Sequence, residues 1–403
     1  MDKKPEKLVP EVRFKGFTDD WEQHKLGDVA KIIGGGTPNT KIPAYWNGTI
    51  NWYTPVEIGK KIYINESQRK ITLDGLKHSS AKLLPKNSVL FTSRAGIGKM
   101  AILGEEATTN QGFQSIIPIA KELDSYFLFS LSNQLKYYGE THGAGSTFTE
   151  ISGKELAKFK LILPKLNEQK IISKLIMMMD KLISLQQRKL NQLKRLKRAM
   201  LQQLFVDKNC KQPILRFKNF NDNWEERKLS DIANYRNGKA HEQYIDMNGI
   251  YTVVNSKFIS TNGKVKKFSN KPIELLKKGE IAFVLSDVPN GKALAKAYLI
   301  DSDNRYSLNQ RIAGITPSSD INSYFLYILM NRNRYFLKFD DGVGQTNLSK
   351  KDIEEFKENY PLFDEQQKIA NLFSKIQILI TLQQNKLTQL TTLKKYLLQK
   401  LFI

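Results

Sequence analysis

The 403-residue sequence contains one cysteine, Cys210, and four histidines. A single cysteine excludes a disulfide framework and a cysteine-based metal cluster, and four scattered histidines disfavour a zinc site. No window of 18 apolar residues occurs, so we expect no membrane-spanning helix. The first seven residues have no apolar core, so we expect no signal peptide either. The sequence therefore predicts a cytoplasmic protein.

The motifs of common catalytic sites are also missing. Gly98-Lys99 is followed by Met100 and Gly291-Lys292 by Ala293, so neither forms a nucleotide-binding P-loop. His241-Glu242 has no second histidine four residues on, which excludes that zinc-protease motif. No Pro-Pro dipeptide occurs, so the Asn/Asp-Pro-Pro-aromatic motif of amino-methyltransferases is absent. We interpret the chain as a non-catalytic binding protein that holds no metal and no cofactor of its own.

The charge is strongly one-sided. Lys and Arg number 63 against 40 Asp and Glu, which leaves a net charge of +23. A polyanion-binding protein uses such an excess, whereas an enzyme of small metabolites rarely carries it. With 40% apolar residues the chain can build packed cores, and its length predicts two to three domains.

The sequence contains an internal repeat. Residues 10–30 return as residues 213–233 with 12 of 21 positions identical, and residues 182–205 return as 379–402 with 15 of 24 identical. The segments between them agree only weakly. A repeat with constant ends and divergent middles indicates a common frame that carries two unlike binding domains.

Two long helices are predicted near residues 168–205 and 365–402, where neither Pro nor Gly occurs and apolar residues follow a heptad. Two such apolar seams should pack on each other. The seams are interrupted by four polar layers: Gln186, Lys197, Gln383 and Lys394. An antiparallel register in which facing residue numbers add to 580 would pair Lys197 with Gln383 and Gln186 with Lys394, so we predict that register. The alternative is that each helix packs on its neighbouring globular domain.

Both predicted helices carry an excess of basic residues over acidic ones. Residues 181–206 include seven basic residues and no acid, and the second helix has six and none after Glu365. A purely structural coiled coil normally mixes signs, so an anionic partner is the simpler interpretation.

Short β-rich runs broken by turns fill residues 31–160 and 235–357, for example at 88–92, 115–118, 249–254 and 280–285. A short helix is predicted late in each, at 126–138 and 323–336. The fold class is therefore α+β. Loops rich in Gly, Asn, Gln, Lys and Arg suit contact with base edges and phosphates. The candidate DNA-binding residues are Thr37, Asn39, Arg94, Lys99, Asn110, Gln111, Lys239, Asn290, Lys292, Asn309, Gln310 and Arg311. For any single one of them, ordinary turn chemistry or solvated charge is at least as good an interpretation.

Taken together, these pieces resemble a known family, the specificity (S) subunits of type I restriction–modification systems. The resemblance rests on the repeated Arg-Phe-x-x-Phe-x-x-x-Trp-Glu-x-x-x-Leu-x-Asp openings and the Pro-x-x-x-Glu-Gln helix starts at 164–169 and 361–366. It also rests on the motifs Gly34-Gly-Gly-Thr-Pro38, Tyr45-Trp-Asn-Gly48, Ser79-Ser-Ala-Lys82, Leu90–Gly98, Thr109–Phe113 and Gly145–Phe148.

The resemblance implies a pseudo-twofold protein with two target recognition domains separated by two antiparallel coiled-coil helices. The implied domains are 1–163 and 207–360 for target recognition, with spacer helices at 164–206 and 361–403. Each recognition domain would read one half of a bipartite double-stranded DNA target. The helices would recruit two modification (methyltransferase) subunits, through which restriction subunits join. S-adenosylmethionine, ATP and Mg²⁺ would be held by those partners. A coiled-coil scaffold that binds an acidic protein or RNA stays open as the alternative.

Overall fold

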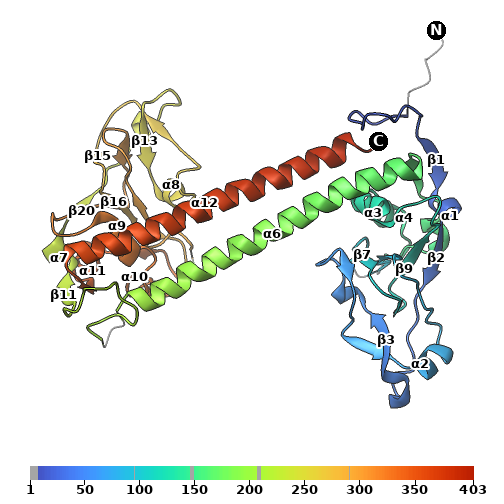
Figure 1. Ribbon diagram of the computed structural model, residues 1–403. Helices are drawn as coiled ribbons and strands as arrows, with labels where there is room; N and C mark the ends of the chain where they lie inside the picture. Colours follow the sequence, from blue (N-terminus) through green and yellow to red (C-terminus); the bar gives the residue numbers. More distant parts are fainter. Residues whose placement is uncertain (1–7, 95, 146–148, 207–209, 290) are drawn as a thin grey trace, which may run out of the picture. The chain divides into compact units, whose positions relative to one another are not determined.

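The computed structural model describes residues 8–94, 96–145, 149–206, 210–289 and 291–403 (Figure 1). The chain divides into two compact units, of which unit 1 comprises residues 1–187 with 385–403 and unit 2 comprises residues 188–384. Two long helices, α6 (Leu166–Leu204) and α12 (Phe363–Lys400), contribute residues to both units. Each unit therefore contains one β-rich domain and half of each long helix.

The β-rich domain of unit 1 is built on a five-stranded sheet in the order β2-β9-β6-β7-β4 and a three-stranded sheet in the order β5-β3-β8. A separate antiparallel pair, β1 with β10, precedes helix α6. The strands are β1 (Glu22–Lys25), β2 (Ala30–Gly34), β3 (Trp46–Tyr53), β4 (Tyr63–Ile64), β5 (Arg69–Ile71), β6 (Val89–Phe91), β7 (Met100–Leu103), β8 (Ala107–Thr109), β9 (Gln114–Pro118) and β10 (Lys160–Leu163). The shorter helices are α1 (Leu26–Val29), α2 (Leu73–Lys77), α3 (Ser125–Ser130), α4 (Ser132–His142) and α5 (Gly153–Leu156).

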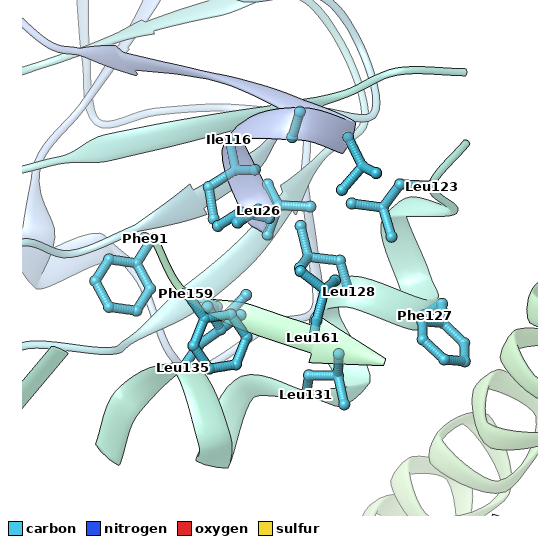
Figure 2. Packing of buried hydrophobic residues seen from close by; sticks show 14 of the residues in the cluster. Leu26, Phe91, Ile116, Leu123, Phe127, Leu128, Leu131, Leu135, Phe159 and Leu161 are labelled. Atoms are coloured by element: carbon cyan, nitrogen blue, oxygen red, sulfur yellow. The ribbon is translucent and has the colours of Figure 1, made fainter. Parts of the chain in front are cut away.

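The core of unit 1 lies between its larger sheet and the helices α3 and α4. Figure 2 shows side chains of this core, among them Phe91 from β6, Ile116 from β9 and Leu128 from α3. Strand β6 is buried at every position because apolar residues face both of its sides. Leu401 and Phe402, which directly follow α12, also enter this core.

The β-rich domain of unit 2 has two four-stranded sheets, β12-β20-β16-β18 and β14-β13-β19-β15, and two antiparallel pairs, β11-β22 and β17-β21. The strands are β11 (Glu225–Lys228), β12 (Ala233–Asn237), β13 (Tyr251–Val254), β14 (Phe268–Ser269), β15 (Leu275–Leu276), β16 (Ile281–Val284), β17 (Ser286–Asp287), β18 (Ala297–Leu299), β19 (Tyr306–Leu308), β20 (Ile312–Pro317), β21 (Thr346–Asn347) and β22 (Lys357–Tyr360). The helices are α7 (Leu229–Ile232), α8 (Ser256–Ser260), α9 (Ser323–Met330), α10 (Arg334–Leu337) and α11 (Lys350–Glu354).

The α+β class and the long helices are confirmed, and the four predicted strand runs coincide with β6, β9, β13 and β16. The two predicted short helices are each broken into two helices. In unit 2 the break falls at residues 331–333, where Arg332 has a positive φ of 60° and the Asn333 side chain caps α10. Such a conformation ends one helix and starts the next, which apolar periodicity alone does not reveal.

Within each unit the two long helices run antiparallel, as predicted. In unit 1, Ile176 of α6 shares the core with Leu401, which directly follows α12, and Asp180 forms an ion pair with Lys394 at 2.5 Å. In unit 2, Leu204 shares the core with Phe373, and Lys197 Nζ donates to Gln377 Oε1 at 2.7 Å.

The predicted register is wrong. The residue numbers of both polar pairs add to 574, not 580, so Lys197 meets Gln377 rather than Gln383 and Lys394 meets Asp180 rather than Gln186. Gln377 precedes Gln383 by six residues, about 9 Å along a helix. Two causes fit this shift. Lys394 gains a carboxylate where Gln186 would offer a neutral amide, and the helix ends insert apolar side chains into the domain cores.

Candidate nucleic-acid interface

The start of each long helix is held by a buried ion pair. Arg13 forms two hydrogen bonds of 2.8 Å with Glu168, and Arg216 forms the equivalent pair with Glu365 at 2.9 and 2.8 Å. Both glutamates are only 1% exposed. The hydrogen bonds that Arg13 donates to Glu168 raise the pKa of Arg13 above its ordinary value. The repeated opening of each copy is thereby fixed to the first turn of its own helix.

The glutamine that follows each glutamate ties the same helix to the β-rich domain. Gln169 accepts from the backbone N–H of Asp124 and donates to the carbonyls of Glu122 and Pro164, all at 2.9 Å. Gln366 makes the equivalent bonds to Asn322, Asp320 and Pro361. Sequence reasoning recognised the Glu-Gln helix starts but missed these partners. The repetition of Arg-Phe and Glu-Gln in both copies was the signal that could have found them.

In unit 1, three loops that follow strand ends meet at one edge of the domain. Gly36 N–H donates to Thr109 O at 2.8 Å, which joins the loop after β2 to the end of β8. Ser93 N–H donates to Gly112 O at 2.9 Å and brings in the loop after β6. A Cβ on Gly35 would lie 1.9 Å from Asn110 O, so only glycine permits this close approach.

This edge, residues 34–39, 92–94, 96–99 and 109–113, is called edge 1. It brings together Thr37 and Gln111, whose side chains are 2.5 Å apart from Oγ1 to Oε1. Asn110 is also there, but its Oδ1 accepts from Gly112 N–H and shapes the turn. Asn39 is exposed and caps the backbone of Lys41. Edge 1 therefore presents amide and hydroxyl groups, the side-chain types that read base edges.

Two candidate cations sit on the loop between β6 and β7. Arg94 lies 3.8 Å from Glu150, which sequence reasoning did not single out. Lys99 is exposed and its stem runs along Gly59 and Gly96, whose Cβ positions would lie 3.5 and 3.6 Å from it. Lys99 and Lys136 line an open groove of about 340 Å³ together with Glu140, which forms an ion pair with Lys136 at 3.7 Å. The Lys99 ammonium group beside the exposed backbone of Gly96 suits a phosphate.

Unit 2 has an equivalent edge at residues 237–241, 285–289, 291–294 and 308–312, called edge 2. Gln310 N–H donates to Lys239 O at 3.0 Å and Leu285 N–H to Arg311 O at 3.0 Å. A Cβ on Gly238 would lie 2.0 Å from Asn309 O, which repeats the close approach at Gly35. Lys239, Asn309, Gln310 and Arg311 are thus brought together.

The side chains of edge 2 differ from those of edge 1. Lys239 pairs with Glu274 at 3.1 Å, and Gln310 Nε2 donates to Glu242 at 2.6 Å. Arg311 is exposed, with a positive φ of 65°. Lys292 is exposed on the turn held by Asp287, which accepts from the backbone of Ala293. Asn290, the remaining candidate, lies outside the described residues.

Edge 2 rests on buried polar groups that sequence reasoning did not identify. His241 is 1% exposed and bridges Ser307 Oγ and Lys239 O, each at 2.7 Å. Arg236 donates to Glu280 through its two terminal guanidinium nitrogens, Nη1 and Nη2, at 2.5 and 2.7 Å. Burial acts to raise the pKa of Glu280, but the hydrogen bonds from Arg236 and Thr316 outweigh it and lower that pKa. These buried contacts of His241, Arg236 and Glu280 hold the loops of edge 2 in place.

The predicted polar layers of the helices are placed as follows. Lys197 and Lys394 are half-buried and bonded across the helix pair, in unit 2 and unit 1 respectively. Burial lowers the pKa of Lys197. Gln383 is buried and Gln186 half-buried in the middle of their helices. Searching the described helices finds none long and apolar enough to cross a membrane.

A duplicated frame that holds two unlike loop edges, each with amide and cationic side chains, is an arrangement suited to a nucleic-acid recognition protein. The family profile of the type I restriction modification DNA specificity domain matches residues 18–195 and 221–392. The chain therefore belongs to the family of type I restriction–modification specificity subunits. It is the component that recognises the DNA target and is non-catalytic, and cofactors belong to the modification and restriction subunits.

Individual relatives agree with this family. The MjaIX specificity subunit of Methanocaldococcus jannaschii is 29% identical, over 93% of this chain and 90% of the relative. The EcoR124I/EcoR124II specificity subunit of Escherichia coli is 32% identical over 42% of this chain and 43% of its own length. The S subunit structure from M. genitalium shares the fold with a TM-score of 0.66 at 18% identity, over 98% of this chain and 99% of that one.

Proposed function

We propose that the chain reads a bipartite DNA target with one recognition domain for each half. Residues 1–163 and 207–360 are the recognition domains, and residues 164–206 and 361–403 are the spacer helices. The helices set the distance between the half-sites and dock two modification subunits, through which restriction subunits join. The complex works in the cytoplasm on double-stranded DNA.

The observation that carries this proposal is the contrast between frame and edges. The pairs Arg13–Glu168 and Arg216–Glu365 have matching bidentate geometry, and so do the bonds of the glutamine that follows each glutamate. Edges 1 and 2 sit at equivalent places on that frame but carry different side chains. A constant frame suits two copies of one partner, and unlike edges suit two different half-sites.

The candidate contacts divide by chemistry. Arg94 and Arg311 have the donor fork that pairs with guanine, and Gln111 and Gln310 have the amides that pair with adenine. Lys99, Lys239 and Lys292 are exposed ammonium groups suited to phosphates. Thr37, Asn39, Asn110, Asn290 and Asn309 complete the proposed set.

Helix length supports the spacing role. Helix α6 has 39 residues. At a rise of 1.5 Å per residue this is about 58 Å, which exceeds the roughly 34 Å of one turn of B-DNA. The bases between the half-sites would then be measured by the helices and read by neither edge.

The experiment maps methylated adenines in a host that carries this chain with its modification subunit. A chimera receives the loops of edge 1 from a relative of different specificity. The expected result is a target altered in one half only, with the spacer length unchanged. A chimera that alters both halves, or the spacer, contradicts the two-reader proposal. The matched control transplants the loops of edge 2 and should alter the other half.

A further inference from the structure

One face of helix α6 in unit 2 carries four cations and no acid. Arg188 and Arg195 are one heptad apart, Arg198 follows Arg195 by three residues, and Lys194 precedes Arg198 by four. These spacings place all four on one flank of the helix. All four residues are exposed. Within the described part of the chain, no ion pair joins any of them to a carboxylate.

This basic face is absent from the other copy of the repeat. The equivalent positions of α12, 197 residues later, are Asn385, Thr391, Thr392 and Lys395, which leave one cation of four. The apolar positions of the two helices are retained over the same stretch, including Leu190 and Leu387. The two helices therefore keep the same apolar positions but differ in the charge of this face.

We infer that the α6 basic face, residues 188, 194, 195 and 198, binds the phosphate backbone of the duplex between the two half-sites. This inference rests on the proposed function. A partner that docks in two identical copies needs the same surface twice, whereas the spacer duplex is a single ligand for each chain. A surface that occurs once is suited to the single ligand.

The chemistry favours phosphate over an acidic protein. Three of the four cations are arginines, whose planar fork pairs bidentately with phosphate oxygens. Duplex DNA presents about one negative charge per 1.7 Å of axis, so a run of cations without interspersed acids matches it. Helix α6 begins in unit 1 and ends in unit 2, so it belongs to both recognition units that the duplex must engage.

The test replaces all four cations by glutamine in the full chain, assembled with its modification subunits. Glutamine keeps helix propensity while it removes the charge. The matched control replaces four other exposed cations of the helices, Lys189, Lys375, Lys386 and Lys395, which gives the same change in net charge. Binding to a duplex with the mapped target is measured from low to high salt, and assembly is checked by gel filtration.

The basic-face variant should lose affinity, and its plot of log K against log salt should be shallower by about two to four. Its preference for target over scrambled duplex should remain, because phosphates carry no sequence. The control should change the slope by less than one. Equal slopes for the two variants, or loss of the modification subunits from the basic-face variant alone, would overturn the inference.

A second measurement tests directly whether the basic face contacts the phosphates of the spacer. Neutral methylphosphonates replace the phosphates of the spacer in the same duplex. Wild-type complex should bind this duplex more weakly than the ordinary one, and the basic-face variant should bind both equally. If the variant still loses affinity on the neutral spacer, the face does not contact it. If wild-type complex shows no preference for target over scrambled duplex, the proposed function fails instead, which is a different outcome.

Discussion

Lys197 donates its hydrogen bond to the neutral amide of Gln377, at the position where the other repeat pairs Lys394 with the carboxylate of Asp180. The two contacts are equivalent under the 197-residue shift of the helices. Burial lowers the pKa of Lys197, since its partner supplies no negative charge. At this position the helix pair therefore holds an ion pair in unit 1 and, in unit 2, a half-buried lysine bonded to a neutral amide.

Replacing Gln377 by Asp should stabilise unit 2. The new carboxylate compensates a lysine that is already desolvated, so we expect a gain of about 1 kcal/mol, or roughly 2–4 °C in melting temperature. Thermal unfolding at neutral pH measures it. The reciprocal control, Asp180→Gln, should lower the melting temperature, because Lys394 and the Tyr126 hydroxyl both lose their carboxylate. A stabilising Asp180→Gln change would contradict this account.

Removing one partner of the helix-start ion pairs should be costly. Arg13→Ala leaves Glu168 buried at 1% exposure without its cation, and breaking such a pair typically costs about 3–5 kcal/mol. Arg216→Ala should have the same effect in unit 2. Calorimetry of each variant should show one unfolding transition at a lower temperature than in the wild type. Arg13→Lys, which keeps charge but loses the fork, should fall between wild type and alanine; equality with wild type would refute the bidentate role.

The Arg236–Glu280 pair should make unit 2 sensitive to acid. The folded-state pKa of Glu280 is lowered from its ordinary value of 4.5, so the stabilisation is fully present above that value. It is lost as pH falls through the lowered pKa, because the unfolded chain binds the proton first. Melting temperatures recorded from pH 6 downward should fall less steeply for Glu280→Gln, which starts lower at pH 6 since Arg236 loses its charge partner.

The fold was more accessible to sequence reasoning than the site. Heptads and the repeat predict α6 and α12 because packing enforces periodicity. Register was missed since it depends on Asp180, which lies outside the seam positions, and on helix ends that enter the cores. The candidates on edges 1 and 2 come from loop composition, which indicates residue types but not supports such as His241 or Glu280. Those supports are buried polar residues without local pattern, so only the three-dimensional arrangement reveals them.

Lys99 should contribute to affinity without contributing to specificity. Its ammonium group lines the groove with Lys136, so Lys99→Ala should weaken binding to all duplexes alike and reduce the salt slope by about one. Salt-dependent binding of target and scrambled duplexes measures both quantities. Lys121→Ala, an exposed lysine outside both edges, is the control and should change neither. A target-specific loss in Lys99→Ala would assign Lys99 to base reading instead.

The glycines of the two edges offer the sharpest test of independent reading. A Cβ at Gly35 would lie 1.9 Å from Asn110 O, and one at Gly238 would lie 2.0 Å from Asn309 O, so either Gly→Ala change must push its loops apart. The frame contacts at Glu168 and Glu365 are separate from these loops, so the folded complex should still assemble. We expect Gly35→Ala to relax or abolish reading of one half-site and Gly238→Ala the other, as seen by mapping methylated adenines. If both changes degrade the same half, or both halves together, the two edges are not separate readers.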